Sequence, residues 1–328
     1  MEQHSLIGRS KAIENIRKQI ANIVKGKNDV LIIGEHGVGK GAVAKTIHDT
    51  QYSSNGSEEH PFVSVCAAVT DSKELEAILV GFERGVPGLP PTTKRGLFEL
   101  GHGGTVLIEE IEEASFRNQK IVLNFLQTRK SVRLGSTEER HSDVRVVLTM
   151  KKPPEELVEE RKLYAEFATQ LKELERISIP PLRERPEDIP LLVKHFVGEI
   201  TRELGLNDIA LDINTIDVLI RHPWRENIRE LKAVVDKSVL FSQGGQFVLP
   251  QELVDEKTEV VKMISNVVTG REFILDKSLD LIEKGIIERA LNRFGFNQSR
   301  TANFLGMTEQ TLRYKLKRLG IPSARQRR

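Results

Sequence analysis

Hydrophobic residues along the first half of the chain are grouped in short runs. Four runs are rich in β-branched residues and are bounded by turn-forming residues: NDVLIIG, PFVSVCAAV, GTVLIEEI and VRVVLTM. Such runs predict buried strands, and the stretches between them have helical periodicity. Because strands and helices alternate, we predict an α/β fold with a parallel sheet and helices on both of its faces.

The periodicity becomes helical after PLRERPEDI. IPLLVKHFVGEI and IRELKAVVDKSVL are amphipathic, and the chain ends in three further helical segments, LDLIEKGIIERALNRF, QSRTANFLG and TEQTLRYKLKRLG. We therefore predict four parts: an α/β subdomain over 1–178, a helical subdomain over 179–241, a linker over 242–276 and an all-α domain over 277–328.

Composition excludes several classes of protein. The 328 residues are 39% hydrophobic and 29% charged, which is ordinary for a globular protein of about two domains. Cys66 is the single cysteine, and no Cys/His cluster has zinc spacing. The N-terminus lacks a signal-peptide pattern, and no apolar run approaches the roughly 18 residues that span a bilayer. We expect a soluble, cytoplasmic protein without a membrane partner.

Charge is unevenly distributed along the chain. Residues 289–328 carry ten Lys or Arg and one acidic residue, Glu309, so this part has a net charge of +9, and the remainder has −7. A strongly basic end predicts a polyanionic partner.

The stretch VLIIGEHGVGKG, residues 30–41, joins a predicted strand to a predicted helix through three glycines and a lysine. Glycines let the backbone wrap around phosphates, whose oxygens accept N–H bonds from the loop and from the start of the helix. Lys40 supplies a cation for the outer phosphates. The alternative is a glycine-rich turn that binds nothing, and Gly41 stands where many phosphate loops have Ser or Thr.

Two adjacent carboxylates, Glu109 and Glu110, end the apolar run of GGTVLIEE. In a nucleotide site one such carboxylate can hold Mg²⁺ and the other can orient a water. The alternative is a solvated strand end.

The C-terminal segment QSRTANFLGMTEQTLRYKLKRLGI has the plan of a helix-turn-helix, with Gly306 at the turn and Thr308 as an N-cap. Leu312, Leu316 and Leu319 form one apolar stripe of the second helix, so the remaining faces suit the major groove of double-stranded DNA. The alternative is a basic solvated helix. The candidate DNA-contacting residues are Gln310, Thr311, Arg313, Tyr314, Lys317 and Arg318.

Together these segments resemble the bacterial enhancer-binding proteins, which are AAA+ activators of sigma-54 RNA polymerase. LIGRSKAIENI is similar to the family's segment beside the adenine, GEHGVGKG to its Walker A loop and RGLFELGHGGTVLIEEI to the stretch that ends in Walker B. IPPLRERPEDIPLL resembles the entry to the helical lid, and HPWRENIREL resembles the sensor II helix. The last segment resembles the family's Fis-type helix-turn-helix.

The resemblance implies an AAA+ P-loop fold that binds ATP and Mg²⁺, with Glu110 as the catalytic glutamate and Glu109 as the metal ligand. It also implies contact with RNA polymerase, a dimer paired through the helix LDLIEKGIIERAL, and a possible ring oligomer. The nucleotide-binding residues that it implies are Ile7, Gly34, Glu35, His36, Gly37, Val38, Gly39, Lys40, Gly41 and Arg229.

The chain departs from the family where a neighbouring subunit usually supplies two arginines. It reads LYAEFATQL there, which puts Tyr164 and Gln170 in the two arginine places and leaves Arg161 or Lys162 as the nearest substitutes. Arginine fingers increase phosphoryl-transfer rates by about 10³ to 10⁵. This change predicts weak turnover.

Three further departures weaken the same chemistry. The sensor I strand reads VLTMK, with Met150 and Lys151 where Thr and Asn are usual, although Thr149 is a neighbouring hydroxyl. PFVSVCAAV lacks the Asn that restrains the catalytic glutamate in family members. Glu109 replaces the usual Asp, and one extra methylene suits octahedral Mg²⁺ poorly.

The loop that contacts sigma-54 in the family is also different. Its Gly-Ala-Phe-Thr-Gly-Ala motif corresponds here to FERGVPGLPPTTKRG, in which Gly85 is in register but the aromatic ring and threonine are missing. Three prolines predict a stiffer loop. Three mechanisms stay open: a working sigma-54 activator, a regulator that uses bound ATP as a structural ligand or assembly switch, and a scaffold with a vestigial nucleotide site. We favour the second.

Overall fold

The computed structural model describes residues 6–53, 60–206, 209–242, 247–250, 253, 283–288, 290–291, 294 and 296–321. The chain divides into two compact units: Met1–Leu211 with Leu219–Val248, and Asp212–Val218 with Leu249–Arg328. Most of the predicted linker, the start of the predicted pairing helix and the arginines at 325, 327 and 328 lie outside the described residues.

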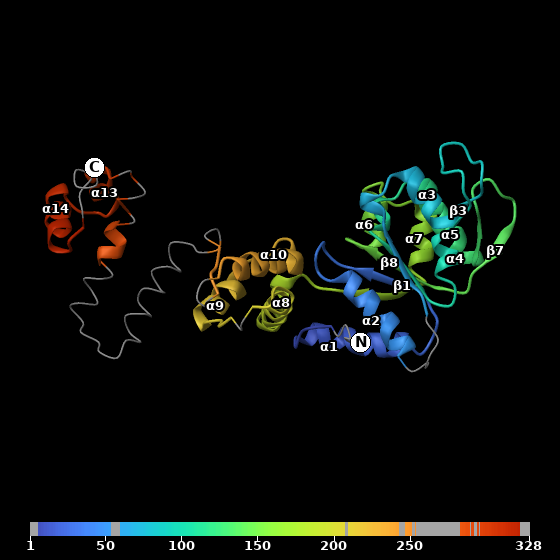
Figure 1. Cartoon of the computed structure of the whole chain (residues 1–328), viewed down its shortest axis with the longest axis horizontal. Coiled ribbons are helices and arrows are strands. Elements are labelled where there is room, and N and C mark those ends of the chain that lie inside the picture. The colour runs from blue at the N-terminus through green and yellow to red at the C-terminus, as the bar shows by residue number, and fades with distance from the viewer. Residues whose placement is uncertain are drawn as a thin grey trace. The chain divides into compact units, whose positions relative to one another are not determined.

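A five-stranded parallel sheet forms the centre of the first unit, in the order β2-β5-β8-β1-β9 (Figure 1). Its strands are β1 (Val30–Ile33), β2 (Phe62–Cys66), β5 (Thr105–Glu109), β8 (Arg145–Met150) and β9 (Glu175–Ser178). The four strands predicted from apolar runs are confirmed. The apolar pattern does not predict β9, because this edge strand buries only Ile177.

Helices cover both faces of the sheet, as the alternating pattern predicts. Along β1, Val30 and Ile32 pack against one set of helices, whereas Leu31 and Ile33 pack into the opposite core. Successive strand residues point to opposite faces, so a strand buried on both sides reads as a continuous apolar run. The helices of the first face are α1 (Lys11–Ile23) and α2 (Lys40–Tyr52), and those of the second are α3 (Ser72–Val80), α5 (Phe116–Thr128) and α7 (Ala165–Leu171).

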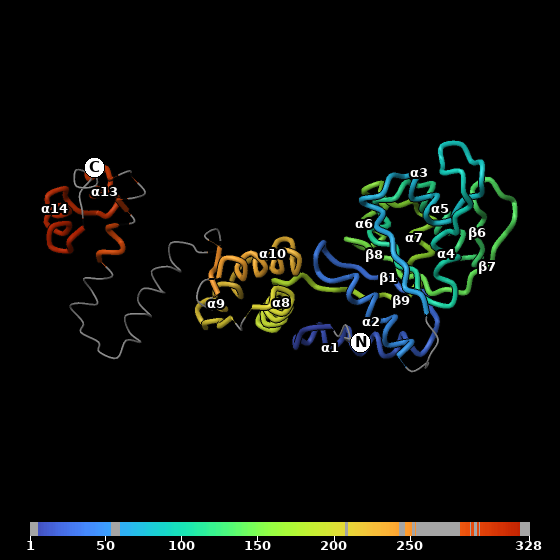
Figure 2. Tube along the Cα trace, viewed as in Figure 1, coloured from blue at the N-terminus to red at the C-terminus, as the bar shows by residue number. Residues whose placement is uncertain are grey.

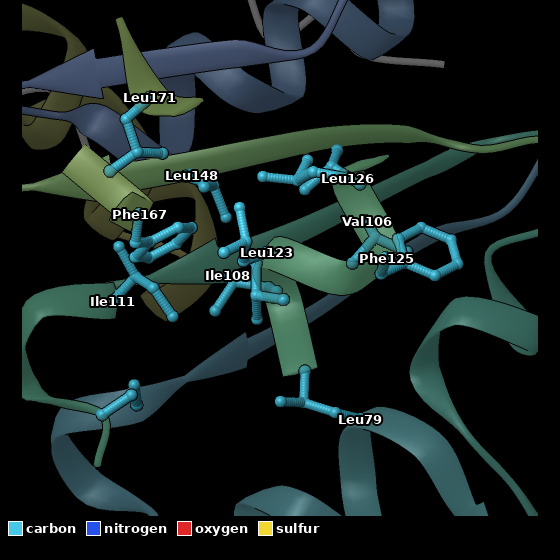
Figure 3. Packing of buried hydrophobic residues seen from close by; sticks show 14 of the residues in the cluster. Leu79, Val106, Ile108, Ile111, Leu123, Phe125, Leu126, Leu148, Phe167 and Leu171 are labelled. Atoms are coloured by element: carbon cyan, nitrogen blue, oxygen red, sulfur yellow. The ribbon is translucent and has the colours of Figure 1, made fainter. Parts of the chain in front are cut away.

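The second core is shown in Figure 3. Ile108 of β5 and Leu148 of β8 lie beside Leu123 of α5 and Phe167 of α7, and all four side chains are buried. This packing fixes the carboxyl ends of β5 and β8, where the predicted Walker B and sensor I residues are located.

Short elements complete the α/β part. They are the helices α4 (Leu97–Leu100) and α6 (Pro154–Glu159), the 3-10 turns η1 (Ala67–Val69), η2 (Ile111–Glu113), η3 (Leu182–Glu184) and η4 (Pro186–Asp188), and the strands β3 (Gly81–Phe82), β4 (Lys94–Arg95), β6 (Lys130–Val132) and β7 (Glu139–His141). Strands β3 and β4 form one antiparallel hairpin, and β6 and β7 form another.

The loop between β3 and β4 is the proline-containing segment that departs from the family. The Arg133 guanidinium donates to the Glu99 carboxylate at 2.7 and 2.6 Å and to Glu83 at 3.0 Å. Thr93 donates to Glu83 at 3.0 Å from the other end of the loop. Side chains therefore fix both ends of this loop, and Arg133 ties its first residue to the strand pair β6-β7.

The helices α8 (Ile189–Leu204), α9 (Ile213–Arg221) and α10 (Asn227–Leu240) follow the α/β part. Helices α8 and α10 pack against each other, and Figure 2 shows them as neighbours. Leu192 and Val193 of α8 and Leu231 and Val235 of α10 are buried, as their helical spacing predicts. Helix α8 ends at Gly205, which adopts a left-handed conformation with φ 62°.

The second unit contains α13 (Gln298–Phe304) and α14 (Glu309–Arg318). Thr308 caps α14 by accepting a bond from the Thr311 N–H at 3.1 Å, and Gly306 has φ 66° at the turn, so both predictions are confirmed. Leu312 and Leu316 are buried and Leu319 packs against them, which confirms the predicted stripe.

Candidate functional site

The glycine loop lies between β1 and α2, where the sequence predicts it. Gly37 and Gly39 have φ 75° and 103°, conformations that favour glycine. A Cβ on Gly37 would lie 2.1 Å from the Glu226 carbonyl oxygen. Both its backbone conformation and this clash therefore exclude a side chain at 37. Helix α2 begins at Lys40, and its first N–H groups have no partners within the helix.

Lys40 is held at the centre of this loop. Its side-chain Nζ donates to the carbonyl oxygens of Gly34 at 2.8 Å and Glu35 at 3.0 Å, and the residue is only 7% exposed. Burial lowers the pKa of Lys40, while the nearby Glu110 and Glu112 carboxylates oppose this shift. Within the described residues no carboxylate forms an ion pair with it.

Glu109 is the last residue of β5, and its carboxylate faces the start of α2. A Cβ on Gly41 would lie 3.7 Å from Glu109 Oε2, which is an ordinary van der Waals distance. Burial raises the pKa of Glu109, and the Lys40 charge opposes that shift. The two unusual residues at 41 and 109 are thus neighbours.

Glu110 follows in a left-handed backbone conformation, φ 53° and ψ 49°. Its N–H donates to Thr149 Oγ1 at 3.1 Å, so Thr149 supports the Glu110 backbone. Its carboxylate has a cation on one side, because Lys151 Nζ is 3.2 Å from Oε2. On the other side His36 Nε2 is 3.8 Å from Oε1.

The helical lid contacts the loop directly. The Ile228 N–H donates to the Gly37 carbonyl at 2.9 Å, and Asn227 Nδ2 donates to the His36 carbonyl at 2.8 Å. Arg229 Nη1 lies 2.9 Å from His36 Nε2. The predicted sensor II residue therefore contacts the loop through His36.

Glu35 points away from Lys40 and toward the entry to the lid. Its carboxylate accepts two bonds from the Arg183 guanidinium, at 2.6 and 2.8 Å. Hydrogen bonding to Arg183 lowers the pKa of Glu35. The Glu35 carbonyl thus accepts from Lys40 and the His36 carbonyl from Asn227, while their side chains contact Arg183 and Arg229.

A cavity of about 810 Å³ lies beside the loop. This volume is within the usual range of small-molecule sites. Ile7, Val38, Arg185, Ile228 and Arg229 are among the residues that line it. The structure therefore brings Ile7 and Arg229, 222 residues apart in sequence, to the same cavity.

The two positions that replace the family's arginines carry no charge. Tyr164 packs its ring between Phe116 and Phe167, and burial raises its pKa to about 12. Gln170 forms side-chain bonds with Gln127 and Glu173, at 3.4 and 3.2 Å.

Neither suggested substitute reaches the glycine loop within this chain. Lys162 forms an ion pair with Glu113 at 3.1 Å. Arg161 is exposed, with φ 58°.

The candidate DNA-contacting side chains are all exposed on α14 or at its start, as predicted. Tyr314 is 66% exposed, which is unusual for a large ring. Arg313 donates to Glu309 at 2.5 Å and to Gln298 at 3.1 Å, and Arg318 donates to Glu283. Two of the candidate cations are thus partnered within the domain.

Several contacts at the site are not predicted from the sequence. Lys151 is expected there only as a replaced residue, yet it pairs with Glu110 across 41 positions. Asn227 and Asp188 each join segments more than 170 residues apart. No local periodicity predicts such long-range pairs. The only sequence signal for them is the presence of polar residues inside the motifs RENIREL and RPEDI.

Two features are absent from the part of the chain that the structure describes. No helix there is long and apolar enough to cross a membrane. No group of three or more His, Cys, Asp or Glu residues there is arranged to hold a metal ion.

Comparison with known families gives three matches in chain order. Residues 6–176 match the Sigma-54 interaction domain, residues 183–262 match the AAA+ ATPase lid domain, and residues 278–319 match the Fis family of bacterial regulatory proteins.

Individual relatives match nearly all of the chain. The transcriptional activator RocR of Bacillus subtilis is 32% identical over 97% of this chain and 69% of its own length. The transcriptional regulatory protein XylR of Pseudomonas putida is 31% identical over 97% of this chain and 57% of its own length. A crystal structure of NtrX from Brucella abortus in complex with ATP has a TM-score of 0.67 at 27% identity, covering 96% of this chain and 69% of that one.

The chain therefore spans between 57% and 69% of the length of these relatives. Within that span the order of the three matched domains agrees with the sheet, lid and helix-turn-helix described above. The chain belongs to the family of transcription regulators that carry the Sigma-54 interaction domain, here with an AAA+ lid and a Fis-type helix-turn-helix.

Proposed function

We propose that the chain is a DNA-binding transcription regulator that binds ATP with Mg²⁺, hydrolyses it slowly or not at all, and uses it as an assembly or conformational switch. Lys40 carries the binding part of this proposal. Its buried ammonium is bonded only to loop carbonyls within the described residues, beside glycines that leave the backbone open to phosphate oxygens. The complexes of NtrX with ATP and with ADP support the same assignment.

Glu109 is the residue we assign to Mg²⁺. Mg²⁺ is usually held by one or two carboxylates together with substrate phosphates and waters. A single carboxylate beside the phosphate loop is therefore enough protein contribution to a Mg²⁺ site. Its carboxylate lies beside Gly41, at the start of α2. Bound phosphates would supply the negative charge for Lys40, and Mg²⁺ would supply the positive charge for Glu109.

Slow turnover rests on the residues at 164 and 170. A ring packed among phenylalanines and a neutral amide cannot stabilise charge on a transferred phosphoryl group in a neighbouring subunit. A fully active sigma-54-dependent ATPase that remodels RNA polymerase is the second candidate, and the retained Glu110 favours it. Self-association and contact with polymerase are part of both proposals.

Calorimetry and a phosphate-release assay on the full chain separate these functions. We expect saturable ATP binding, and phosphate release at the level of the Glu110→Gln variant, with or without DNA and at protein concentrations where oligomers form. Steady phosphate release that Glu110→Gln abolishes would establish the activator instead. A wild type that binds no ATP would leave only a scaffold role.

DNA binding is tested at Arg313. We expect Arg313→Ala to weaken specific binding by about 1–3 kcal/mol and non-specific binding much less, if its guanidinium exchanges Glu309 for a base edge. Lys317→Ala is the matched control, because an exposed lysine of the same helix is expected to weaken binding to all sequences alike. Gel-shift titrations on operator and random DNA measure both; equal losses for Arg313→Ala would make it a phosphate contact.

A further inference from the structure

The strongest unexplained feature of the nucleotide site is the cation at its catalytic glutamate. Lys151 directly follows β8, and its Nζ lies 3.2 Å from Glu110 Oε2 and 3.4 Å from Glu113 Oε1. The Glu110 side chain is only 10% exposed, so this carboxylate oxygen faces a lysine instead of open solvent. The pair is therefore a partly buried contact, which solvent and salt screen less than a surface ion pair.

The position of Lys151 is fixed from its backbone. Its N–H donates to Glu112 Oε1 at 2.8 Å, and Glu112 itself is 3% exposed. Glu113 is held in turn by Lys162 at 3.1 Å. The lysine side chain thus starts from an anchored residue and ends between two carboxylates, one of which already has another partner.

The backbone of Glu110 is fixed beside this cation. Its backbone is in the left-handed region, and its N–H is bonded to Thr149 Oγ1. Its second oxygen faces His36, whose ring is 2.9 Å from Arg229. Rotation of the carboxylate would bring its other oxygen to the lysine and would leave the ion pair in place.

We propose that Lys151 is a positioning residue that holds the Glu110 carboxylate in an ion pair and so withholds it from an attacking water. To act as a base, Glu110 must accept the proton of a water whose oxygen bonds to phosphorus while the bridging P–O bond breaks, and this needs the carboxylate to be turned toward that water. The ion pair keeps the carboxylate turned toward Lys151 instead. The proposal rests on the proposed function, because it supplies a second cause of slow turnover besides the missing arginines.

The turnover experiment uses the full chain with Lys151→Met, Lys151→Asn and Lys151→Arg. We expect phosphate release per site to rise at least about tenfold in the two neutral variants, since a positioned general base contributes about 10² to 10⁴. Lys151→Arg keeps the cation and should stay at the wild-type rate, and the KM for ATP should change little in any of them. Adding Glu110→Gln to Lys151→Met should return the rate to the wild-type level.

Lys152→Met is the matched control. It removes the same charge one residue away, where the lysine pairs with Glu160, and it should leave turnover unchanged. Equal or lower rates in both neutral Lys151 variants overturn the proposal, and a fall that Lys151→Arg rescues would make the lysine a stabiliser of phosphate charge instead.

A second measurement needs no nucleotide. Thermal unfolding of the wild type, Lys151→Met, Glu110→Gln and the double variant forms a cycle that reports the pair itself. Non-additive shifts in Tm are expected, and additive shifts overturn the proposal. Failure of the wild type to bind ATP would reject the proposed function, while this cycle would still decide whether Lys151 holds Glu110.

Discussion

Replacing Lys40 by alanine is expected to abolish ATP binding. The side chain offers an ammonium that is already buried and aligned between two carbonyls of the loop. Two of its three N–H donors are bonded to the loop, so one remains for phosphate. A hydrogen bond to a charged group contributes about 1.5–3 kcal/mol, so its loss corresponds to at least about a tenfold rise in Kd, and the loss of the cation beside the phosphates raises Kd further. Isothermal titration of the full chain with Mg²⁺ and ATP measures this directly.

Two controls make the Lys40 result specific. Lys18→Ala removes an equal charge from the exposed face of α1 and should bind ATP like the wild type. Unfolding of Lys40→Ala should remain cooperative, because α2 keeps its buried residues Val43, Ala44 and Ile47. Wild-type affinity in Lys40→Ala would show that ATP binds elsewhere or that the loop backbone alone holds it.

The three inner strands of the sheet could be predicted from the sequence because they are buried on both faces. Each of β1, β5 and β8 is a continuous apolar run, and this signal needs no knowledge of neighbours. The edge strand β9 has one buried residue, Ile177, and its pairing with β1 joins positions about 145 residues apart. Local patterns carry no information of that kind.

The candidate site was predictable in its parts but not in its contacts. The glycines, Lys40 and the two glutamates are adjacent in sequence to the strands that position them. The effect of Lys151 was not predictable, because its residue type alone does not say whether the ammonium points to a phosphate or to Glu110. Lys151 replaces the Asn that is usual at this position, so the usual amide is lost. The ion pair with Glu110 is a contact that the structure shows in its place.

Gly41 and Glu109 are a second case in which the sequence shows the residues but not their contact. Gly41 stands where many phosphate loops have Ser or Thr, and Glu109 replaces the usual Asp of the metal ligand. In the structure they are neighbours, because a Cβ at 41 would lie 3.7 Å from Glu109 Oε2. The proposed slow turnover therefore rests on the residues at 164, 170 and 151, and not on the metal ligand.

Asp188 links the N-terminal segment to the entry of the lid, and replacing it by alanine is expected to be severely destabilising. Its Oδ1 accepts the N–H groups of Arg9 at 2.6 Å and Ser10 at 2.7 Å, and its Oδ2 accepts the Ser10 hydroxyl at 2.7 Å. Asp188 is fully buried, and the guanidinium of Arg185, which is 1% exposed, lies 3.9 Å away.

Asp188→Ala would leave a buried guanidinium without its counter-charge and three donors without their acceptor. Removing one partner of a buried ion pair costs about 3–5 kcal/mol, so we expect a loss of this size in the free energy of unfolding of the first unit. Urea denaturation followed by circular dichroism measures it. ATP affinity should fall as well, because Asp188 fixes the segment after Ile7, and Ile7 and Arg185 line the cavity.

Asp188→Asn separates charge from hydrogen bonding at this position. Its amide oxygen can still accept from the N–H groups of Arg9 and Ser10, but it gives Arg185 no negative charge, so we expect an intermediate loss of stability. Equal losses in Asp188→Asn and Asp188→Ala would assign the whole effect to the charge. A loss below about 1 kcal/mol in Asp188→Ala would mean that water replaces the carboxylate and that the N-terminal segment is held by other contacts.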